Sequence, residues 1–377
     1  MKREDIRILG VAEEDPFHYQ TWSGSSAYLF NALRQSEHLY TAVSADPPQF
    51  VNAVHKVLSF HPNLNAWRFR YHTNVRHYEQ RTRSAMRAIS ALDDTGYDVI
   101  LQIGAWFNLA KRKDKVTVSY HDGNLSALLK SPFGAPSVGK RWITRALSYE
   151  RTFYHDVDHI FTMSRWLADS FRSDFGVPAS KLSPVGAGIN LPYTTEINTK
   201  SYDNKRILFV GKDFERKGGY YLLEAFRLVR CEIKDATLTI IGPRLAALPE
   251  GVTCLNYVSK FTPEGLSELM THYVSASVFV LPSLYEPFGI SLAEAMAHKL
   301  PCVGTNICAI PEIIDDKVTG LVVPVRDAKT LAKRLIGLLK DPLACKELGD
   351  RGFKKYQTDY TWDAVVKKMV ECMTHFV

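Results

Sequence analysis

Long apolar runs are the first feature that this 377-residue sequence lacks. No stretch contains the 18 or more apolar residues that a membrane-spanning helix requires, and the longest candidate, 274–284, is interrupted by Ser and Pro. Residues 1–7 lack the apolar centre of a signal peptide. These absences predict a chain that does not span a membrane and that works in the cytoplasm.

Cysteine is scarce as well: the six cysteines all lie in the C-terminal half, and none forms a C-x-x-C pair for zinc or redox chemistry. We expect them to be reduced and mostly buried small hydrophobes. With 46% hydrophobic and 23% charged residues, the composition is that of an ordinary globular protein. The length predicts two domains of roughly 150–200 residues each.

Short apolar runs alternate with segments of helical spacing along the whole sequence, which predicts parallel sheets covered by helices. The predicted strands are 6–11, 39–43, 98–103, 116–120, 159–163, 182–185, 206–210, 236–241, 278–282, 301–304 and 320–323. The predicted helices include 26–34, 219–229, 262–273, 290–298, 330–339, 343–355 and 362–373.

The alternation lapses over 190–204, where Pro, Thr, Asn, Lys and Ser follow one another without periodicity, as in a linker. It then restarts, which predicts a second domain of the same kind. The expected fold class is therefore α/β with two Rossmann-like domains, at 1–195 and 196–360. A last helix within 361–377 can cross back to the N-terminal domain.

The most informative stretch runs from a strand end at Pro282 through a turn into a helix. The helix should begin near Ile290, so its first amide N–H groups would be unpaired and would form an anion site. Glu286 lies before the helix and Glu294 lies more than one turn inside it, roughly 10 Å away at 1.5 Å per residue. The alternative is that Glu286 caps the helix and Glu294 is solvated. The residues expected around the anion are Gly289, Ile290, Ser291 and Leu292.

A second strand-to-helix stretch, 208–219, supplies the opposite charge. Gly211 allows the chain a sharp exit from the strand, and Arg216 and Lys217 place two cations at the strand's carboxyl end. Clamping a diphosphate is the natural use of such a pair. A solvated basic turn paired with neighbouring acidic residues would give the same sequence.

Three stretches of the N-terminal half have the same strand-to-helix layout with weaker signals. The loop around Gly24 has small residues where a ligand could approach, but such turns are common. His121 lies on a loop after a strand, where a structural histidine is the alternative to a catalytic one. Ser164 is most simply interpreted as a helix cap.

Taken together, these stretches resemble the retaining, group-1 family of glycosyltransferases (family 4), which has the GT-B fold of two Rossmann-like domains facing each other across a cleft. The most specific pieces are 286–294, which looks like the family's Glu, seven residues, Glu motif, and 211–219, which looks like its Gly, Lys, Gly donor loop. Many members carry Arg where this chain has Lys212.

The resemblance implies transfer of a glycosyl unit from a nucleotide diphosphate sugar to a glycan, lipid-linked or other hydroxyl acceptor, with retention of anomeric configuration. No cofactor and no metal ion are expected. Glu286 and His121 would contact the donor sugar, Glu294 the ribose, and Arg216 and Lys217 the diphosphate. The remaining donor-binding residues would be Gly24 and Gly211, with backbone groups at Tyr257 and Val258 near the base.

The net charge of +7 is concentrated in the N-terminal half, which predicts that this domain takes the acceptor and contacts an anionic membrane surface peripherally. The proposed contact is a helix within 76–92, and a solvated helix face is the alternative. Its basic row and its apolar residues are Arg76, Arg83 and Arg87, and Met86, Ile89 and Leu92.

Two other functions remain open. One is a nucleotide-sugar-binding subunit without catalysis, and the other is a different GT-B enzyme, an inverting transferase or an epimerase. No recognised motif supports nucleic-acid binding by the basic half.

Overall fold

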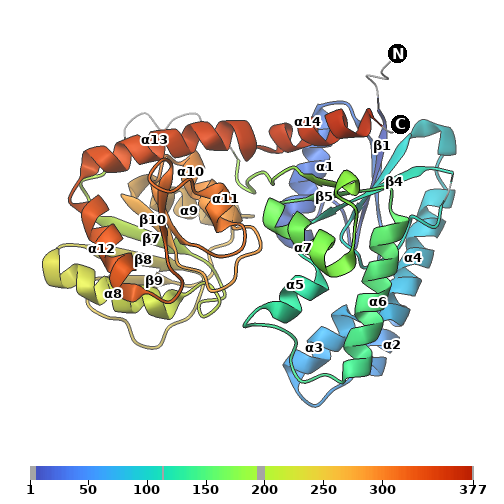
Figure 1. Cartoon of the computed structure of the whole chain (residues 1–377), viewed down its shortest axis with the longest axis horizontal. Coiled ribbons are helices and arrows are strands. Elements are labelled where there is room, and N and C mark those ends of the chain that lie inside the picture. The colour runs from blue at the N-terminus through green and yellow to red at the C-terminus, as the bar shows by residue number, and fades with distance from the viewer. Residues whose placement is uncertain (1–5, 113, 193–199, 376–377) are drawn as a thin grey trace. The chain divides into compact units, whose positions relative to one another are not determined.

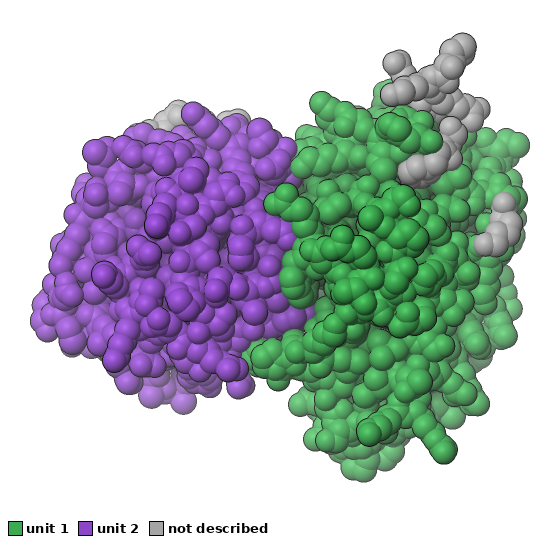
Figure 2. Space-filling model, in the orientation of Figure 1, with its two compact units in different colours: residues 1–188, 362–377 green, residues 189–361 purple. Residues whose placement is uncertain are grey.

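The computed structural model describes residues 6–112, 114–192 and 200–375. The chain divides into two compact units, coloured green and purple in Figure 2. Unit 1 contains residues 1–188 and 362–377, and unit 2 contains residues 189–361. The boundary placed at 195/196 from the sequence, like the middle of the linker, lies outside the described residues.

Unit 1 contains a six-stranded parallel sheet in the order β2-β1-β3-β4-β5-β6. Its strands are β1 Ile8–Ala12, β2 Leu39–Ser44, β3 Val99–Ile103, β4 Val116–His121, β5 His159–Thr162 and β6 Leu182–Pro184. Its α-helices are α1 Ser25–Gln35, α2 Gln49–Leu58, α3 Leu64–His72, α4 Val75–Ser90, α5 Leu125–Lys130, α6 Lys140–Asp156, α7 Arg165–Phe175 and α14 Trp362–Met373 (Figure 1). Short 3-10 turns occupy Thr21–Gly24, Asp94–Gly96 and Ala179–Lys181.

Unit 2 repeats the plan with the order β12-β11-β10-β7-β8-β9. Its strands, again all parallel, are β7 Arg206–Val210, β8 Thr237–Ile241, β9 Val252–Leu255, β10 Val278–Leu281, β11 Cys302–Thr305 and β12 Gly320–Val323. Its helices are α8 Gly219–Glu232, α9 Pro263–Ser275, α10 Ile290–Ala297, α11 Ile310–Ile313, α12 Ala328–Leu339 and α13 Pro342–Asp359. The α/β class predicted from the sequence is confirmed.

The central strands are apolar without alternation because helices cover both faces of each sheet. Every residue of β1, β3 and β10 is buried. Several helices begin at residues whose side chains satisfy a free amide: the Ser164 hydroxyl accepts from Leu167 N–H at 3.1 Å, which confirms its interpretation as a cap. Parallel strands joined in this way bring all their carboxyl ends to one edge of each sheet.

Two expectations about unit 1 and the cysteines are corrected. Ile89 of α4 is buried and Met86 packs against the same core, so the apolar side of this helix faces the protein, while Arg76, Arg83 and Arg87 are exposed. Of the six free cysteines, two are buried, three are intermediate and one is exposed, so the expectation that most of them are buried is wrong. The sequence patterns also missed α2, α3, α5, α6, α11 and β9.

Candidate functional site

The strand order of unit 2 reverses between β7 and β10, and the loops that follow these two strands carry the two strongest motifs of the sequence. Such a reversal is where open α/β sheets usually bind ligands. The loops are joined directly, because the Leu284 N–H donates to the Arg216 carbonyl at 2.8 Å. Residues 211–218 and 282–289 therefore form one local structure at the carboxyl edge of the sheet.

Gly218 is the residue that lets the two loops approach. Its φ is +73°, in the left-handed region, and a Cβ atom at this position would lie 1.9 Å from the Pro282 carbonyl oxygen. A side chain would therefore be strained by its backbone conformation and would also collide with the neighbouring loop.

The close approach brings Lys217 and Arg216 to Glu286. Lys217 Nζ lies 2.9 Å from Glu286 Oε2, Arg216 Nη1 lies 3.5 Å from it, and the Ser283 hydroxyl donates to it at 3.2 Å. Burial raises the pKa of Glu286, but the two cations outweigh burial, and the net pKa is below the ordinary value. The carboxylate is therefore ionised and held by two cations.

Arg216 has further partners within the same two loops. Its Nη1 donates to the Tyr285 carbonyl at 2.8 Å, and its Nε pairs with Asp213 at 3.1 Å. The alternative of a basic turn paired with local acidic residues is thus partly present in the structure. The guanidinium also contacts Tyr285 and Glu286 on the second loop, so it does not serve only to neutralise acidic residues of its own turn.

Glu294 is the fifth residue of α10, and its side chain is buried rather than solvated. The Tyr273 hydroxyl donates to its Oε2 at 3.1 Å, and Lys260 Nζ lies 3.3 Å from its Oε1. His298 stacks on Tyr273 at 4.8 Å between ring centroids, and its Nδ1 lies 2.7 Å from the Glu294 carbonyl oxygen. A buried carboxylate fixed on several sides is positioned for a specific contact, since burying it costs free energy.

The start of α10 differs in one respect from the expected anion site. Gly289, with a φ of +100°, precedes Ile290, and the Leu292 N–H donates to the Gly289 carbonyl at 2.9 Å. The prediction of an unpaired amide is therefore wrong for Leu292, because the first turn closes on itself. The Ser291 hydroxyl, also at this turn, is buried without a hydrogen-bond partner among the described residues.

Gly211 directly follows β7, and its N–H donates to the Ile241 carbonyl of β8 at 2.9 Å. The next residue, Lys212, is the departure from the family pattern, and its ammonium lies 3.7 Å from the centroid of the Tyr257 ring. This contact links the loop after β7 to the segment after β9 that contains Tyr257 and Val258. The sequence did not predict the pairing, because the two segments are joined only through the order of the strands.

In unit 1 the turn at Gly24 is tightly specified. Trp22 and Ser23 have positive φ values of 48° and 56°, and Gly24 has 91°. The Trp22 ring packs edge-on against Tyr120 at 5.3 Å, and its side chain hydrogen-bonds to the Asp122 carboxylate. The loops after β1 and β4 are therefore held together at the carboxyl edge of this sheet.

His121 was expected on a loop, but the structure makes it the last residue of β4 with its imidazole in the core. Its ring lies among Phe153, Tyr154 and Phe171, and its Nε2 lies 2.9 Å from the Ser119 hydroxyl. Burial lowers the pKa of His121 to about 3, so the ring is neutral. The expected placement is corrected, and its contact with the donor sugar stays a prediction. The exposed polar side chain at this strand end is that of Asp122.

Among the described residues, no three His, Cys, Asp or Glu side chains gather in a way that could hold a metal ion. The two carboxylates of an Asp-x-Asp sequence are a possible pair of metal ligands, and one such sequence occurs at 156–158. It precedes β5, and the Asp158 carboxylate instead accepts a hydrogen bond from Thr117 N–H at 2.8 Å. In the part of the chain that the structure describes, no helix is both long and apolar enough to cross a membrane.

Both units match family models of glycosyltransferases. Residues 26–192 match the model described as Glycosyltransferase Family 4, and residues 204–341 match the model described as Glycosyl transferases group 1. The two matches together span most of the chain, and both models describe glycosyltransferase domains, which supports a glycosyltransferase of the group-1 kind.

The chain is similar to MMP alpha-(1->4)-mannosyltransferase of Mycolicibacterium hassiacum, with 29% identity over 61% of this chain and 57% of that protein. Sucrose-phosphate synthase from Thermosynechococcus elongatus has the same fold, with a TM-score of 0.69 and 17% identity over 98% of both chains. Anabaena HepE, solved in complex with UDP and glucose, has a TM-score of 0.60 and 13% identity over 98% of this chain and 99% of its own. The matched segments cover 57% to 63% of the first curated relatives.

Proposed function

We propose that the protein transfers a glycosyl unit from a nucleoside diphosphate sugar to a hydroxyl acceptor, with retention of anomeric configuration. The observation that carries this proposal is the contact of Lys217 and Arg216 with Glu286 across the two loops at the strand reversal of unit 2. Two cations and a carboxylate at one such edge suit a ligand that has both phosphates and sugar hydroxyls.

In the proposed mechanism the bond from the anomeric carbon to the diphosphate oxygen breaks while the acceptor oxygen bonds to the same face of the carbon. The leaving diphosphate takes the proton of the acceptor hydroxyl, so no protein nucleophile is needed. Arg216 and Lys217 stabilise the charge that develops on the diphosphate, each contributing roughly 2.7–4 kcal/mol by analogy with other oxyanion contacts.

The two glutamates have separate roles in this proposal. Glu286 accepts hydrogen bonds from hydroxyls of the donor sugar, because its ionised carboxylate already lies beside the cations that bind the diphosphate. Glu294, fixed by Tyr273 and Lys260, accepts from the ribose. Since Arg216 and Lys217 supply the positive charge, the reaction proceeds without a divalent ion.

Similar proteins support the donor class and leave the sugar open. HepE was solved with UDP and glucose, and the similar Mycolicibacterium protein is a mannosyltransferase. We propose a glycan or lipid-linked acceptor bound by unit 1. All six cysteines are free, which is in keeping with the cytoplasmic location that we propose.

A thermal-shift panel of UDP, GDP and ADP sugars tests donor binding. A donor at 100 times its dissociation constant should add about 2.7 kcal/mol of stability to the protein. The product formed from the donor that binds is then analysed by proton NMR, where the anomeric coupling reports its configuration.

Retention supports the proposal. An inverted product, or epimerised donor without transfer, would point to another enzyme on the same fold. Donor binding without turnover or donor hydrolysis, across a broad acceptor panel, would revive the binding-subunit alternative.

A further inference from the structure

In helix α2 of unit 1, the polar side faces the protein and the apolar side faces outward, the reverse of an ordinary surface helix. Its inward side is polar: His55 is buried and stacks on His77 at 4.9 Å, and Asn52 Oδ1 lies 2.7 Å from His77 Nε2. Its outward side is apolar, with exposed residues at the spacing i, i+4, i+7 and i+8. These are Phe50, Val54, Val57 and Leu58.

The apolar surface continues past the end of α2 into the start of α3, through Phe60 and Leu64. We call the six residues Phe50, Val54, Val57, Leu58, Phe60 and Leu64 the apolar tip. Each is 52–72% exposed, and together they are six of the fourteen large hydrophobic side chains that are exposed in the described part of the chain. Such clustering within 15 residues marks an interaction surface, because scattered exposed hydrophobics are normal.

The charge around the apolar tip is mainly positive, although Asp46 lies beside α2, where its Oδ1 accepts a hydrogen bond from Asn52 Nδ2 at 2.9 Å. Residues 47–78 contain no Asp or Glu, and neither do residues 123–149, although the two stretches carry eight Lys and Arg. The two stretches meet at the start of α6: the Trp142 indole N–H donates to Thr73 Oγ1 at 2.9 Å, and the Arg70 guanidinium lies 4.6 Å from the centroid of the Trp142 ring.

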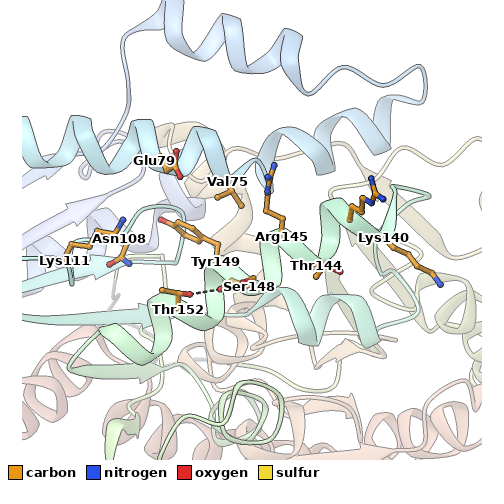
Figure 3. Close-up of a pocket in the computed structure, with 11 residues that line it drawn as sticks. Val75, Glu79, Asn108, Lys111, Lys140, Thr144, Arg145, Ser148, Tyr149 and Thr152 are labelled. Atoms are coloured by element: carbon orange, nitrogen blue, oxygen red, sulfur yellow. Dashed lines mark hydrogen bonds between the residues drawn. The ribbon is translucent and has the colours of Figure 1, made fainter.

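Two hollows extend from this junction. One, of about 430 Å³, joins Leu58 of the apolar tip to Arg76, Arg141 and Arg145. The other, of about 640 Å³, lies between α4 and α6, and Figure 3 shows residues of α6 along one wall opposite Val75 and Glu79 of α4. Its basic residues are Lys111, Lys140, Arg141 and Arg145, and Glu79 is its single acidic residue.

We propose that the apolar tip and the neighbouring basic residues form a docking surface for an anionic phospholipid membrane. The outward side chains of α2 enter the boundary between headgroups and acyl chains, and the basic side chains of the two hollows bind lipid phosphates. A membrane supplies both kinds of partner side by side: an apolar acyl layer for the apolar tip, and above it a layer of negatively charged headgroups for the basic residues.

The surface fits other occupants less well. A second copy of the chain would bring its basic residues against the same basic residues, since a twofold contact pairs identical patches. A nucleic acid would pair with the cations but would leave the outward apolar side of α2 uncovered. This surface also differs from the helix face at 76–92 that the sequence suggested, because the apolar side of α4 is packed in the core.

Co-sedimentation of the full chain with vesicles, in the absence of donor, tests the proposal. We expect binding to vesicles of phosphatidylcholine mixed with phosphatidylglycerol, weak binding to phosphatidylcholine alone, and loss of binding as salt increases. Phe50→Asp should lower the apparent affinity at least tenfold. The double variant Arg141→Ala and Arg145→Ala should lower it about fivefold per charge removed.

Matched controls lie in unit 2. Leu343 is the second residue of α13, as Phe50 is of α2, and the two are 66% and 71% exposed, so Leu343→Asp makes the same change elsewhere. Lys329 and Lys333 of α12 are exposed four residues apart, like Arg141 and Arg145, and their double alanine variant should bind vesicles as the wild type does.

The proposal is overturned if anionic and neutral vesicles bind equally at low salt, or if Phe50→Asp and the double arginine variant bind like their controls while folded. It is also overturned if the wild type binds no vesicles and either self-associates through a contact that Phe50→Asp abolishes or retains nucleic acid that the arginine variant releases. Because the assay needs no donor, its outcome is independent of the proposed transferase activity.

Discussion

Replacing Gly218 by alanine should destabilise unit 2 and weaken donor binding together. The added methyl would meet the Pro282 carbonyl oxygen at 1.9 Å, and the residue would have to keep a φ of +73°. The left-handed conformation costs an L-residue about 1–2 kcal/mol. Separation of the loops would also break the 2.8 Å hydrogen bond from Leu284 N–H to the Arg216 carbonyl, at a cost of about 1 kcal/mol.

The expected loss of stability is thus about 2–3 kcal/mol at least, with the remaining steric overlap adding to it. For a unit of this size the loss corresponds to a fall in Tm of roughly 4–12 °C. Because Lys217 precedes Gly218, the displaced turn would also move its ammonium away from Glu286, and the stabilisation that saturating donor gives to wild-type protein should shrink.

Gly337→Ala is the matched control within the same unit. Gly337 lies in α12, and a Cβ atom there would meet no other atom within 4 Å. Removing glycine from a helix should raise stability by about 0.5–1 kcal/mol, so the two substitutions should shift the calorimetric transition in opposite directions. If Gly218→Ala unfolds at the wild-type temperature and binds donor normally, the inferred coupling of the two loops is wrong.

The remaining predictions concern the site, the absence of a metal requirement and acid stability. Lys217→Ala and Glu294→Gln should each lower donor affinity or turnover tenfold or more in folded protein, while Lys333→Ala changes neither; normal kinetics at limiting and saturating donor would contradict the assigned role. EDTA should leave activity essentially intact, and abolition by EDTA with rescue by manganese or magnesium would refute the metal-independent mechanism. Unit 1 should lose stability as pH falls below about 6.5. Burial lowers the pKa of His77 and of His121 to about 3 in the folded protein, so between these pH values the two imidazoles are protonated in the unfolded chain but not in the folded one. Denaturant unfolding with a constant midpoint between about pH 7 and pH 5 would contradict this sign.

The fold and the central site of unit 2 could be predicted because their signals are local. A strand buried on both faces is a short continuous apolar run, and the two strongest motifs each follow such a run. The order of the strands then brings Lys217 and Glu286 together, and that distance cannot be derived from the sequence alone. The partner of Lys212, Tyr257, was hidden for the same reason, since only the sheet order joins β7, β8 and β9.

Two failures have different physical causes. His121 lies at the end of a strand whose other residues are nearly all buried, so alternation gives no signal for the side to which the ring points. No helix was predicted over the residues of α2, and periodicity would in any case assign the apolar side of a helix to the interior, whereas here that side faces outward. Only the contacts of His55 and Asn52 with His77 reveal the reversal.

Helix α14 has a consequence for the order in which the chain folds during synthesis. It packs on α1 in unit 1 with Val365, Met369 and Met373 fully or almost fully buried, yet all of unit 2 separates it from the rest of that unit. As the ribosome releases the chain, the first sheet emerges long before the helix that completes its covering, and unit 2 can fold in the interval. A fragment that stops before residue 189 should therefore expose an apolar surface on α1 and aggregate, and supplying residues 362–375 as a peptide should restore its solubility.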